Sequence, residues 1–281
     1  MKDCRILTVQ DVSCVGQCSL TVALPILSAM GIETSILPSA VLSTHTGGFS
    51  GFTFRDLTED LVPIMKHWQK ENILFDAFYT GYVGSPKQLA YISDIIDNLS
   101  KKDSIVIIDP VLGDKGKLYT GFSSDFPSMM AGFCAKADVI LPNLTEASFM
   151  LNEKYVEDHH TKEYIEDMLH KLKGLGCKNV LLTGVSFEEG KVGVATLNGQ
   201  TGAVNYYFRD FIGGAFHGTG DVFASSFTGA MVRGYSLEES AKLAVDFTVK
   251  SIECTVGDDS HWYGVKFEKA LPFLIKRLGD C

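Results

Sequence analysis

Short apolar segments alternate with helical patterns along most of this chain, and this alternation is the feature that most restricts its fold. The clearest strand is SIVIIDP at residues 104–110, in which nearly every side chain is apolar. Such a run suits a parallel strand that is buried on both faces of a sheet. Strands that alternate with helices at this spacing predict βαβ units, a mostly parallel sheet and right-handed connections, which is an α/β fold.

The individual elements can be placed along the sequence. We expect strands at residues 5–10, 32–38, 74–79, 104–110, 139–143, 179–184, 191–197 and 202–209. We expect helices at residues 19–30, 58–70, 86–99, from 144 onward, 161–173, 220–233, 237–255 and 265–277. The turn Asn198–Gly199 predicts a hairpin between the last two strands, so one edge of the sheet should be antiparallel. Because no linker and no internal repeat is visible, we expect residues 1–281 to form one domain.

Composition and charge exclude several classes of protein. The chain has 281 residues, of which 46% are apolar, so it can bury a large single core. Its net charge is −9 and it has no basic run, which argues against nucleic-acid binding, because that requires a surplus of Lys and Arg. An acidic protein that binds an anionic substrate must hold the anion locally, with helix N-termini and backbone N–H groups.

Cysteine usage and hydropathy indicate a cytoplasmic protein. The seven cysteines are odd in number and scattered, which favours reduced thiols. No run approaches the 18 or so apolar residues of a membrane span, and no secretory signal pattern is visible, so we expect no membrane partner. Cys14 and Cys18 lack a second pair of ligands and are poor candidates for a zinc site.

Three common motifs of nucleotide-binding and hydrolytic enzymes are absent. Gly116–Lys117 is followed by Leu118, and Gly190–Lys191 by Val192, so neither is a Walker A loop. The turn after the first strand holds only Gly16, and a dinucleotide fingerprint is therefore missing. The G-x-S-x-G elbow of the α/β-hydrolases does not occur either.

The segment GGAFHGTGDVFA at residues 213–224 is the strongest candidate for a reactive site. Gly218, Thr219 and Gly220 stand before an apolar helix, so a tight turn and the positive end of the helix dipole would form an anion hole. Asp221 lies in the first turn, where a carboxylate can accept the proton of a hydroxyl that attacks phosphorus. The alternative is a simple capping turn in which Asp221 only complements the helix dipole.

Four further motifs accompany this one, and together they indicate a family. The five are S-T-H-T-G at residues 43–47, G-Y at 81–82, D-P-V-L-G-D at 109–114, L-P-N-x-x-E at 141–146 and H-G-T-G-D-V-F-A at 217–224. They resemble the motifs of the ribokinase-like sugar and vitamin kinases, and most closely those of the pyridoxal (vitamin B6) kinases. The matches run from about residue 10 to residue 230 in the order found in that family.

The resemblance implies a ribokinase-like kinase domain over residues 1–281 with helices on both faces of its sheet. It also implies ATP-dependent phosphorylation of the 5′-hydroxymethyl group of pyridoxal, pyridoxamine or pyridoxine. Asp221 would contact the acceptor and take its proton, while the N–H groups of Gly218, Thr219 and Gly220 stabilise the transferring group. ATP and Mg²⁺ would be required, a K⁺ requirement is left open, and a homodimer is expected because the family is commonly dimeric.

The same resemblance assigns a nucleotide side to the cleft. Asp114, in a Gly-rich loop after Asp109, and Glu146 would hold Mg²⁺ directly or through water, and Asn143 would meet a phosphate. Solvated surface acids are the alternative for the loop of Asp114. Asn143 could also cap the helix, and this role can hold together with the functional one. Thr183 and Gly184, at the end of a strand, would contact the ATP phosphates. The adenine pocket should be apolar and lie near the late hairpin and the helix at residues 237–255.

An acceptor side is expected in the N-terminal half. Ser13 would contact the pyridine ring, although residues 11–19 lack the second Gly and the Asn of the family pattern. Thr46 would hydrogen-bond a ring substituent, Tyr82 would cover the ring by stacking, and His45 would be a packed side chain within its loop.

Two other functions fit the sequence. A hydroxymethylpyrimidine kinase of the same superfamily also phosphorylates a hydroxymethyl heterocycle. A catalytically silent carrier of vitamin B6 is the alternative from another class, and the presence of Asp221 beside the anion-hole glycines argues against it.

Overall fold

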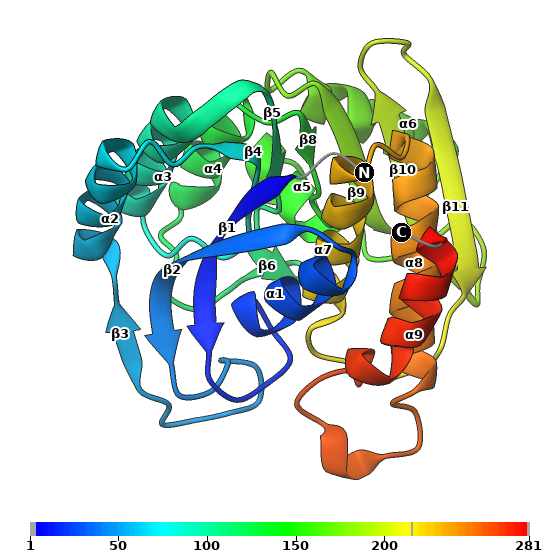
Figure 1. Ribbon diagram of the computed structural model, residues 1–281. Helices are drawn as coiled ribbons and strands as arrows, with labels where there is room; N and C mark the ends of the chain where they lie inside the picture. Colours follow the sequence, from blue (N-terminus) through cyan, green and yellow to red (C-terminus); the bar gives the residue numbers. More distant parts are fainter. Residues whose placement is uncertain (1–3, 215, 280–281) are drawn as a thin grey trace.

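The computed structural model describes residues 4–214 and 216–279 and is built around one large sheet (Figure 1). This nine-stranded sheet has the strand order β11-β10-β9-β8-β5-β4-β1-β2-β3. Its strands are β1 (Arg5–Ser13), β2 (Glu33–Leu42), β3 (Phe54–Asp56), β4 (Phe75–Thr80), β5 (Ser100–Ile108), β8 (Val139–Ile140), β9 (Asn179–Val185), β10 (Lys191–Asn198) and β11 (Val204–Asp210).

The centre of the sheet is parallel and both of its edges are antiparallel. Strands β2, β1, β4, β5, β8 and β9 pair in parallel. At one edge β10 pairs antiparallel with both β9 and β11, and at the other β3 pairs antiparallel with β2. The predicted α/β fold with a mostly parallel sheet and an antiparallel hairpin edge is confirmed.

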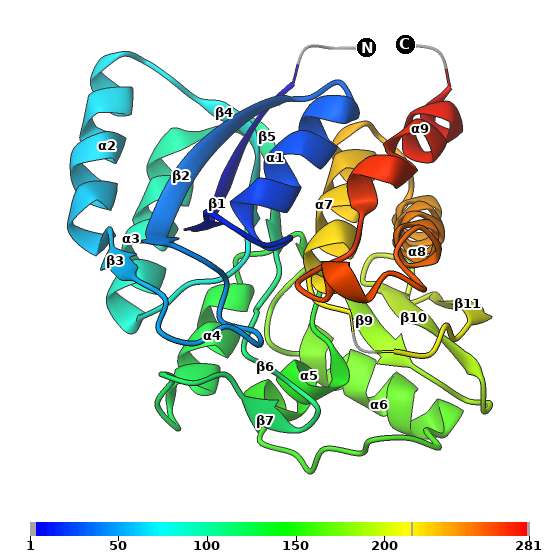
Figure 2. The same ribbon diagram turned by 90° about the horizontal axis from the view of Figure 1, so that it is seen from below.

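Helices cover both faces of the sheet, as Figure 2 shows from below. One face carries α2 (Thr58–Lys70), α3 (Pro86–Leu99), α4 (Phe126–Cys134), α5 (Leu144–Leu151) and α6 (Lys162–Lys173). The other carries α1 (Leu20–Ala29), α7 (Thr219–Val232), α8 (Leu237–Glu253) and α9 (Phe267–Leu278). No helix in the described ranges is both long and apolar enough to cross a membrane.

The two helical layers explain why the central strands read as unbroken apolar runs. In β5, Val106 and Ile108 belong to the core beneath α2–α6, whereas Ile107 belongs to the core beneath α1 and α7–α9. Successive side chains of a strand point to opposite faces, so a strand covered on both faces needs apolar residues at every position.

The structure adds elements that the sequence did not predict. β3 and α4 were not foreseen, and residues 113–118 form a small hairpin of β6 (Gly113–Asp114) and β7 (Lys117–Leu118). The strand expected at residues 139–143 is shorter, because β8 ends at Ile140 and the next three residues lead into α5. The turn between β10 and β11 is longer than predicted and is closed by the Gly202 N–H, which donates to the Asn198 carbonyl.

Candidate active site

The carboxyl ends of the central strands meet at one edge of the sheet and carry a set of polar side chains. Ser13 ends β1, Tyr82 follows β4, Asp109 follows β5, and Asn143 follows β8. Open α/β sheets bind their ligands at this edge. The start of α7 lies there too, because Asp221 is close enough to Asp109 for the two charges to interact. The structure therefore brings the motifs of the N-terminal half and the motif at the start of α7 into one region.

The turn before α7 has the shape expected of an anion hole. Gly218 has φ +76°, and a Cβ built on it would lie 1.7 Å from the carbonyl oxygen of Gln17, so only glycine fits. The helix begins at Thr219, whose hydroxyl donates to the Phe216 carbonyl at 3.3 Å. The first N–H groups of a helix have no intrahelical partner, so those of Thr219 and Gly220 are available to an anion.

Asp221 lies in the first turn of α7 and is half-buried. Burial raises the pKa of Asp221 to about 7, and the charge of Asp11 acts in the same direction. The nearby backbone of Ser19 and side chain of Cys18 act in the opposite direction and lower the pKa of Asp221. A carboxyl that titrates near neutral pH is suited to accept a proton in a reaction at that pH.

Asn143 and Glu146 form a reciprocal cap at the start of α5. The Glu146 N–H donates to Asn143 Oδ1 at 3.0 Å, and the Asn143 N–H donates to Glu146 Oε2 at 2.8 Å. Glu146 Oε1 accepts from the Leu112 N–H at 2.9 Å, and Asn143 Nδ2 donates to the Gly113 carbonyl at 2.9 Å. Both side chains thus have the capping role, and they tie the loop after β5 to α5.

Asp114 lies apart from this cap, at the exposed end of β6. Its Oδ1 accepts from the Lys115 N–H at 2.9 Å, and the hairpin is tied to α5 by the Gly116 N–H, which donates to Thr145 Oγ1 at 3.0 Å. Among the described residues, no three His, Cys, Asp or Glu side chains gather to hold a metal. Mg²⁺ commonly uses one or two carboxylates together with phosphates and water, and the exposed Asp114 carboxylate fits that requirement.

Asp109 and Glu146 form an acidic pair near Asp221. Burial, followed by the charges of Glu146 and Asp221, raises the pKa of Asp109 well above its ordinary value. Burial likewise raises the pKa of Glu146 to about 7, against the hydrogen bonds from the backbone of Asn143 and Leu112. Such clustered acids with raised pKa values are typical of functional sites.

Thr183 and Gly184 lie beside Asn143 at the end of β9. The Thr183 N–H donates to the Pro142 carbonyl at 2.9 Å, and Asn143 and Thr183 form a parallel bridge. Gly184 is exposed, has φ +77° and lies at a register shift between β9 and β10. These two residues are therefore at the same edge as the Asn143 cap, as the sequence predicted.

The residues expected on the acceptor side differ in exposure. Ser13 is buried and its hydroxyl donates to Asp11 Oδ2 at 2.8 Å. Tyr82 is half-buried, with its ring centroid 5.7 Å from that of Phe122, whereas Thr46 is exposed. Of the three, Tyr82 offers an accessible ring face and Thr46 an accessible hydroxyl, while Ser13 acts through Asp11.

His45 fixes the loop that carries Thr46, as the packed-side-chain interpretation proposed. The Gly47 N–H donates to His45 Nδ1 at 3.0 Å, so Nε2 carries the proton and donates to the Tyr263 carbonyl at 2.7 Å. The rings of Phe49 and Trp262 pack 4.6 Å apart across the same junction. The loop around residue 46 is thereby joined to the segment between α8 and α9.

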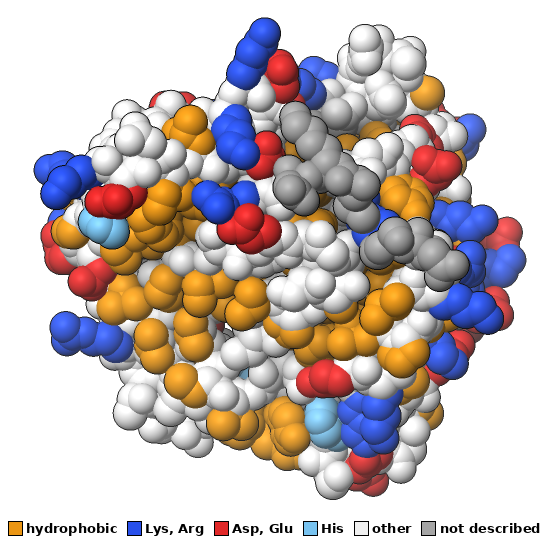
Figure 3. Space-filling view, viewed as in Figure 1, with side chains coloured by type: hydrophobic (Ala, Val, Ile, Leu, Met, Phe, Trp, Pro, Cys, Tyr) orange, Lys and Arg blue, Asp and Glu red, His pale blue; other side chains and the backbone are white. Residues whose placement is uncertain are grey.

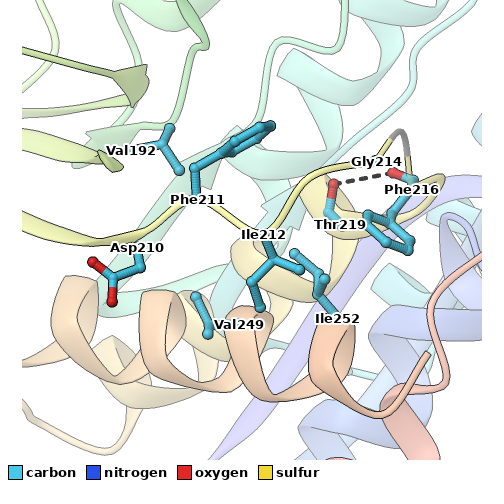
Figure 4. Close-up of a pocket in the computed structure, with 9 residues that line it drawn as sticks. All are labelled: Val192, Asp210, Phe211, Ile212, Gly214, Phe216, Thr219, Val249 and Ile252. Carbon is cyan, nitrogen blue, oxygen red and sulfur yellow. Dashed lines mark hydrogen bonds between the residues drawn. The ribbon is translucent and has the colours of Figure 1, made fainter. Parts of the chain in front are cut away.

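A pocket of about 160 Å³ lies between the end of the β10–β11 hairpin and α8 (Figure 4). It is mostly apolar and is lined by Val192, Asp210, Phe211, Ile212, Gly214, Phe216, Thr219, Val249 and Ile252. Its position agrees with the predicted adenine pocket. Thr219 lines it and also begins α7, so the pocket adjoins the anion hole.

Sequence reasoning missed the contact between the β1–α1 loop and the turn before α7, where the carbonyl oxygen of Gln17 lies against Gly218. The one signal that pointed to this region was the departure from the family pattern at residues 11–19. The sequence analysis assigned no role to Asp11, although its carboxylate accepts hydrogen bonds from both Ser13 and Ser19.

Comparisons with known proteins show which family the chain belongs to. The family model of the phosphomethylpyrimidine kinases matches residues 27–264. A candidate phosphomethylpyrimidine kinase from Bacteroides thetaiotaomicron, solved with pyridoxal, is 39% identical, with a TM-score of 0.92 over 97% of this chain and 96% of that one. Pyridoxal kinase from Lactobacillus plantarum is 31% identical, with a TM-score of 0.90 over 98% of this chain and 97% of that one. Among curated proteins, the pyridoxal kinase of Dictyostelium discoideum is 27% identical over 256 residues, which are 86% of this chain and 81% of its own.

Proposed function

Because the chain belongs to the phosphomethylpyrimidine kinase family, within the ribokinase-like superfamily, we propose that it is a pyridoxal kinase. It transfers the γ-phosphoryl group of ATP to the 5′-hydroxymethyl group of pyridoxal, pyridoxamine or pyridoxine. The similarity to a pyridoxal kinase over 98% of the chain supports the activity. The observation that carries the proposal is the carboxyl of Asp221, which titrates near neutral pH at the helix N-terminus that follows Gly218.

Proton transfer and charge stabilisation are separate tasks at the start of α7. Asp221 accepts the proton of the hydroxymethyl group, and the freed oxygen attacks the γ-phosphorus in line as the bond to ADP breaks. The backbone N–H groups of Gly218, Thr219 and Gly220 stabilise the negative charge on the transferring group. These donors are fixed before the reaction because Gly218 is packed against Gln17.

The nucleotide occupies the side of the cleft that faces β9 and α8. The apolar pocket takes the adenine ring, and Thr183 and Gly184 contact the phosphates. Asp114 would hold Mg²⁺ on its exposed carboxylate. Both carboxylate oxygens of Glu146 accept backbone N–H groups, from Leu112 and Asn143, so we assign Glu146 to positioning the loop after β5 in place of the Mg²⁺ role expected from the sequence. When bound, Mg²⁺ neutralises charge on the β- and γ-phosphates.

The acceptor occupies the side formed by the ends of β1 and β4. Tyr82 covers the pyridine ring, Thr46 hydrogen-bonds one of its substituents, and Ser13 holds Asp11 in place. The exposed position of Thr46 and the half-buried ring of Tyr82 support these assignments.

A hydroxymethylpyrimidine kinase is the second candidate, and the matching family model favours it. A kinase assay over pyridoxal, pyridoxamine, pyridoxine and hydroxymethylpyrimidine, with and without K⁺, separates the two. We expect phosphorylation of at least one B6 vitamer to exceed that of hydroxymethylpyrimidine in kcat/KM. Faster phosphorylation of hydroxymethylpyrimidine than of every vitamer would replace our assignment. The absence of any turnover would favour the silent carrier.

We also propose a cytoplasmic homodimer. Five described cysteines form no disulfide, which supports a reducing compartment: Cys14, Cys18, Cys134, Cys177 and Cys254.

Apolar side chains gather over β2 and its neighbours in the space-filling view of Figure 3. Leu24 of α1, Ile36 of β2 and Phe54 of β3 are all exposed, and a dimer through this face would bury them. Measuring the molecular mass in solution tests this.

A further inference from the structure

We propose that Trp262 is a positioning residue for the acceptor. Its ring packs on residues 43–53, the acceptor loop, and holds that loop with Thr46 in the conformation that meets the acceptor ring. The inference rests on the proposed function, because it takes Thr46 to contact the acceptor. It gives a role to a part of the chain beyond residue 230, where the family resemblance has no motif.

Trp262 belongs to the connection between α8 and α9, which has a backbone fixed by its own hydrogen bonds. This connection, residues 254–266, lies at the edge of the sheet where β1 and β2 end (Figure 1). The ammonium group of Lys266 pairs with the Asp258 carboxylate, and His261 Nδ1 donates to the Gly264 carbonyl at 2.7 Å. The connection therefore presents its aromatic side chains from a constrained backbone.

The acceptor loop is held against this connection by rings and by one hydrogen bond. The ring centroids of Phe49 and Trp262 lie 4.6 Å apart. Gly48 has φ +80°, and a Cβ built on it would lie 2.8 Å from Trp262 Cζ3, so the indole ring lies directly on the loop backbone. Beside this contact, His45 Nε2 donates to the Tyr263 carbonyl at 2.7 Å. Trp262 thus contacts the loop within two residues of Thr46.

The same connection also contacts the segments that form the anion hole. The Val265 N–H donates to the carbonyl of His217, in the turn before α7, at 3.2 Å. A Cβ built on Gly264 would lie 2.3 Å from Gln17 Cβ, and one built on Gly47 would lie 2.7 Å from His217 Cε1. The connection thereby fixes the acceptor loop relative to the turn that would hold the phosphoryl group.

Trp262 is the contact that can be removed without disturbing the core. It is 49% exposed, and the acceptor loop that it covers is itself largely at the surface, with Thr46, Ser50 and Gly51 exposed. A loop that is already held in its bound conformation loses less conformational freedom when a ligand binds. Loss of the indole ring should therefore weaken acceptor binding more than it weakens folding.

The experiment measures binding of pyridoxal and of ADP separately by isothermal titration calorimetry. We expect Trp262→Ala to raise the Kd for pyridoxal by roughly 3–10-fold, the cost of ordering one or two side chains of the loop. The Kd for ADP and the kcat at saturating substrates should each change less than about twofold, because the contacts of Trp262 are on the acceptor side. Trp262→Phe keeps an aromatic ring and should restore most of the pyridoxal affinity.

Ile275→Ala is the matched control, because Ile275 is also 49% exposed but lies on α9. It should change neither Kd. If Trp262→Ala does not fold, Phe49→Ala breaks the same ring pair from the loop side and should give the same split. Unchanged pyridoxal affinity in the folded variants, or equal weakening of pyridoxal and ADP, would overturn the inference alone. An unmutated protein that binds ADP but no pyridoxal would overturn the proposed function and the inference with it.

Discussion

At the scale of single residues, the site depends on the carboxyl of Asp221, whose burial lowers the stability of the folded protein. Burial raises the pKa of Asp221 to about 7 in the folded protein. Between about pH 4 and pH 7 the folded state therefore keeps a proton on Asp221 that the unfolded chain has released. Stability is therefore highest where both states are protonated and falls as the pH rises from about 4 towards 7. Functional groups that cost stability in this way are expected at active sites.

Asp221→Asn, which mimics the protonated form, should remove this cost. We expect the variant to be more stable than the unmutated protein at pH 8 by roughly 1–3 kcal/mol, and the difference to vanish near pH 4. Urea unfolding at the two pH values measures this. Asp94→Asn, at an exposed position of α3, is the control and should show no such pH-dependent gain. Equal stability of Asp221→Asn and the unmutated protein at pH 8 would mean that the carboxyl is not strained by its surroundings.

At the scale of elements, the close contact between the β1–α1 loop and the start of α7 makes the anion hole. Gly218 allows this contact because it has no side chain and adopts φ +76°. Gly220 lies two residues away inside α7, where a Cβ would meet nothing within 4 Å. The same substitution at the two glycines should therefore have opposite effects on stability.

Gly218→Ala should destabilise the protein by roughly 1–3 kcal/mol, since alanine there is strained and clashes with Gln17. Gly220→Ala should leave stability unchanged or raise it by up to about 1 kcal/mol, because alanine favours the helix. Thermal unfolding of both variants without substrates compares them. Equal loss of stability in the two variants would contradict the packing described for the turn.

The elements also show how far the sequence could predict the structure. The apolar run of β5 and the Ser85–Pro86 start of α3 were predicted because burial and capping are local signals. β3 is short, with three exposed residues, and therefore carries no burial signal. α4 begins at Phe126 with Pro127 in its first turn, but the Asp125 side chain makes no capping hydrogen bond, so the start of this helix is only weakly marked. Thr183 and Asn143 could be predicted as neighbours from their strand ends. The contact of Gln17 with Gly218 joins residues about 200 positions apart, and no local pattern reports it.

At the scale of the whole molecule, one continuous sheet places two binding regions beside a shared reactive centre. The acceptor side comes from the ends of β1 and β4, and the nucleotide side from β9, the hairpin and α8. Asp221 lies on α7, which packs against both α1 and α8. That the whole chain acts as one domain stays a prediction, which the nine-stranded sheet from β1 to β11 supports.

The most direct test of this account is the turnover of Asp221→Asn with ATP and pyridoxal, measured as formation of pyridoxal 5′-phosphate. Asparagine keeps the size of the side chain but cannot accept the proton. We expect kcat to fall by about 10²–10⁴-fold while the affinity for ATP changes little, because the adenine pocket and the N–H groups of the turn remain. A variant that forms pyridoxal 5′-phosphate at the rate of the unmutated protein would remove Asp221 from the mechanism and contradict the assignment of the site.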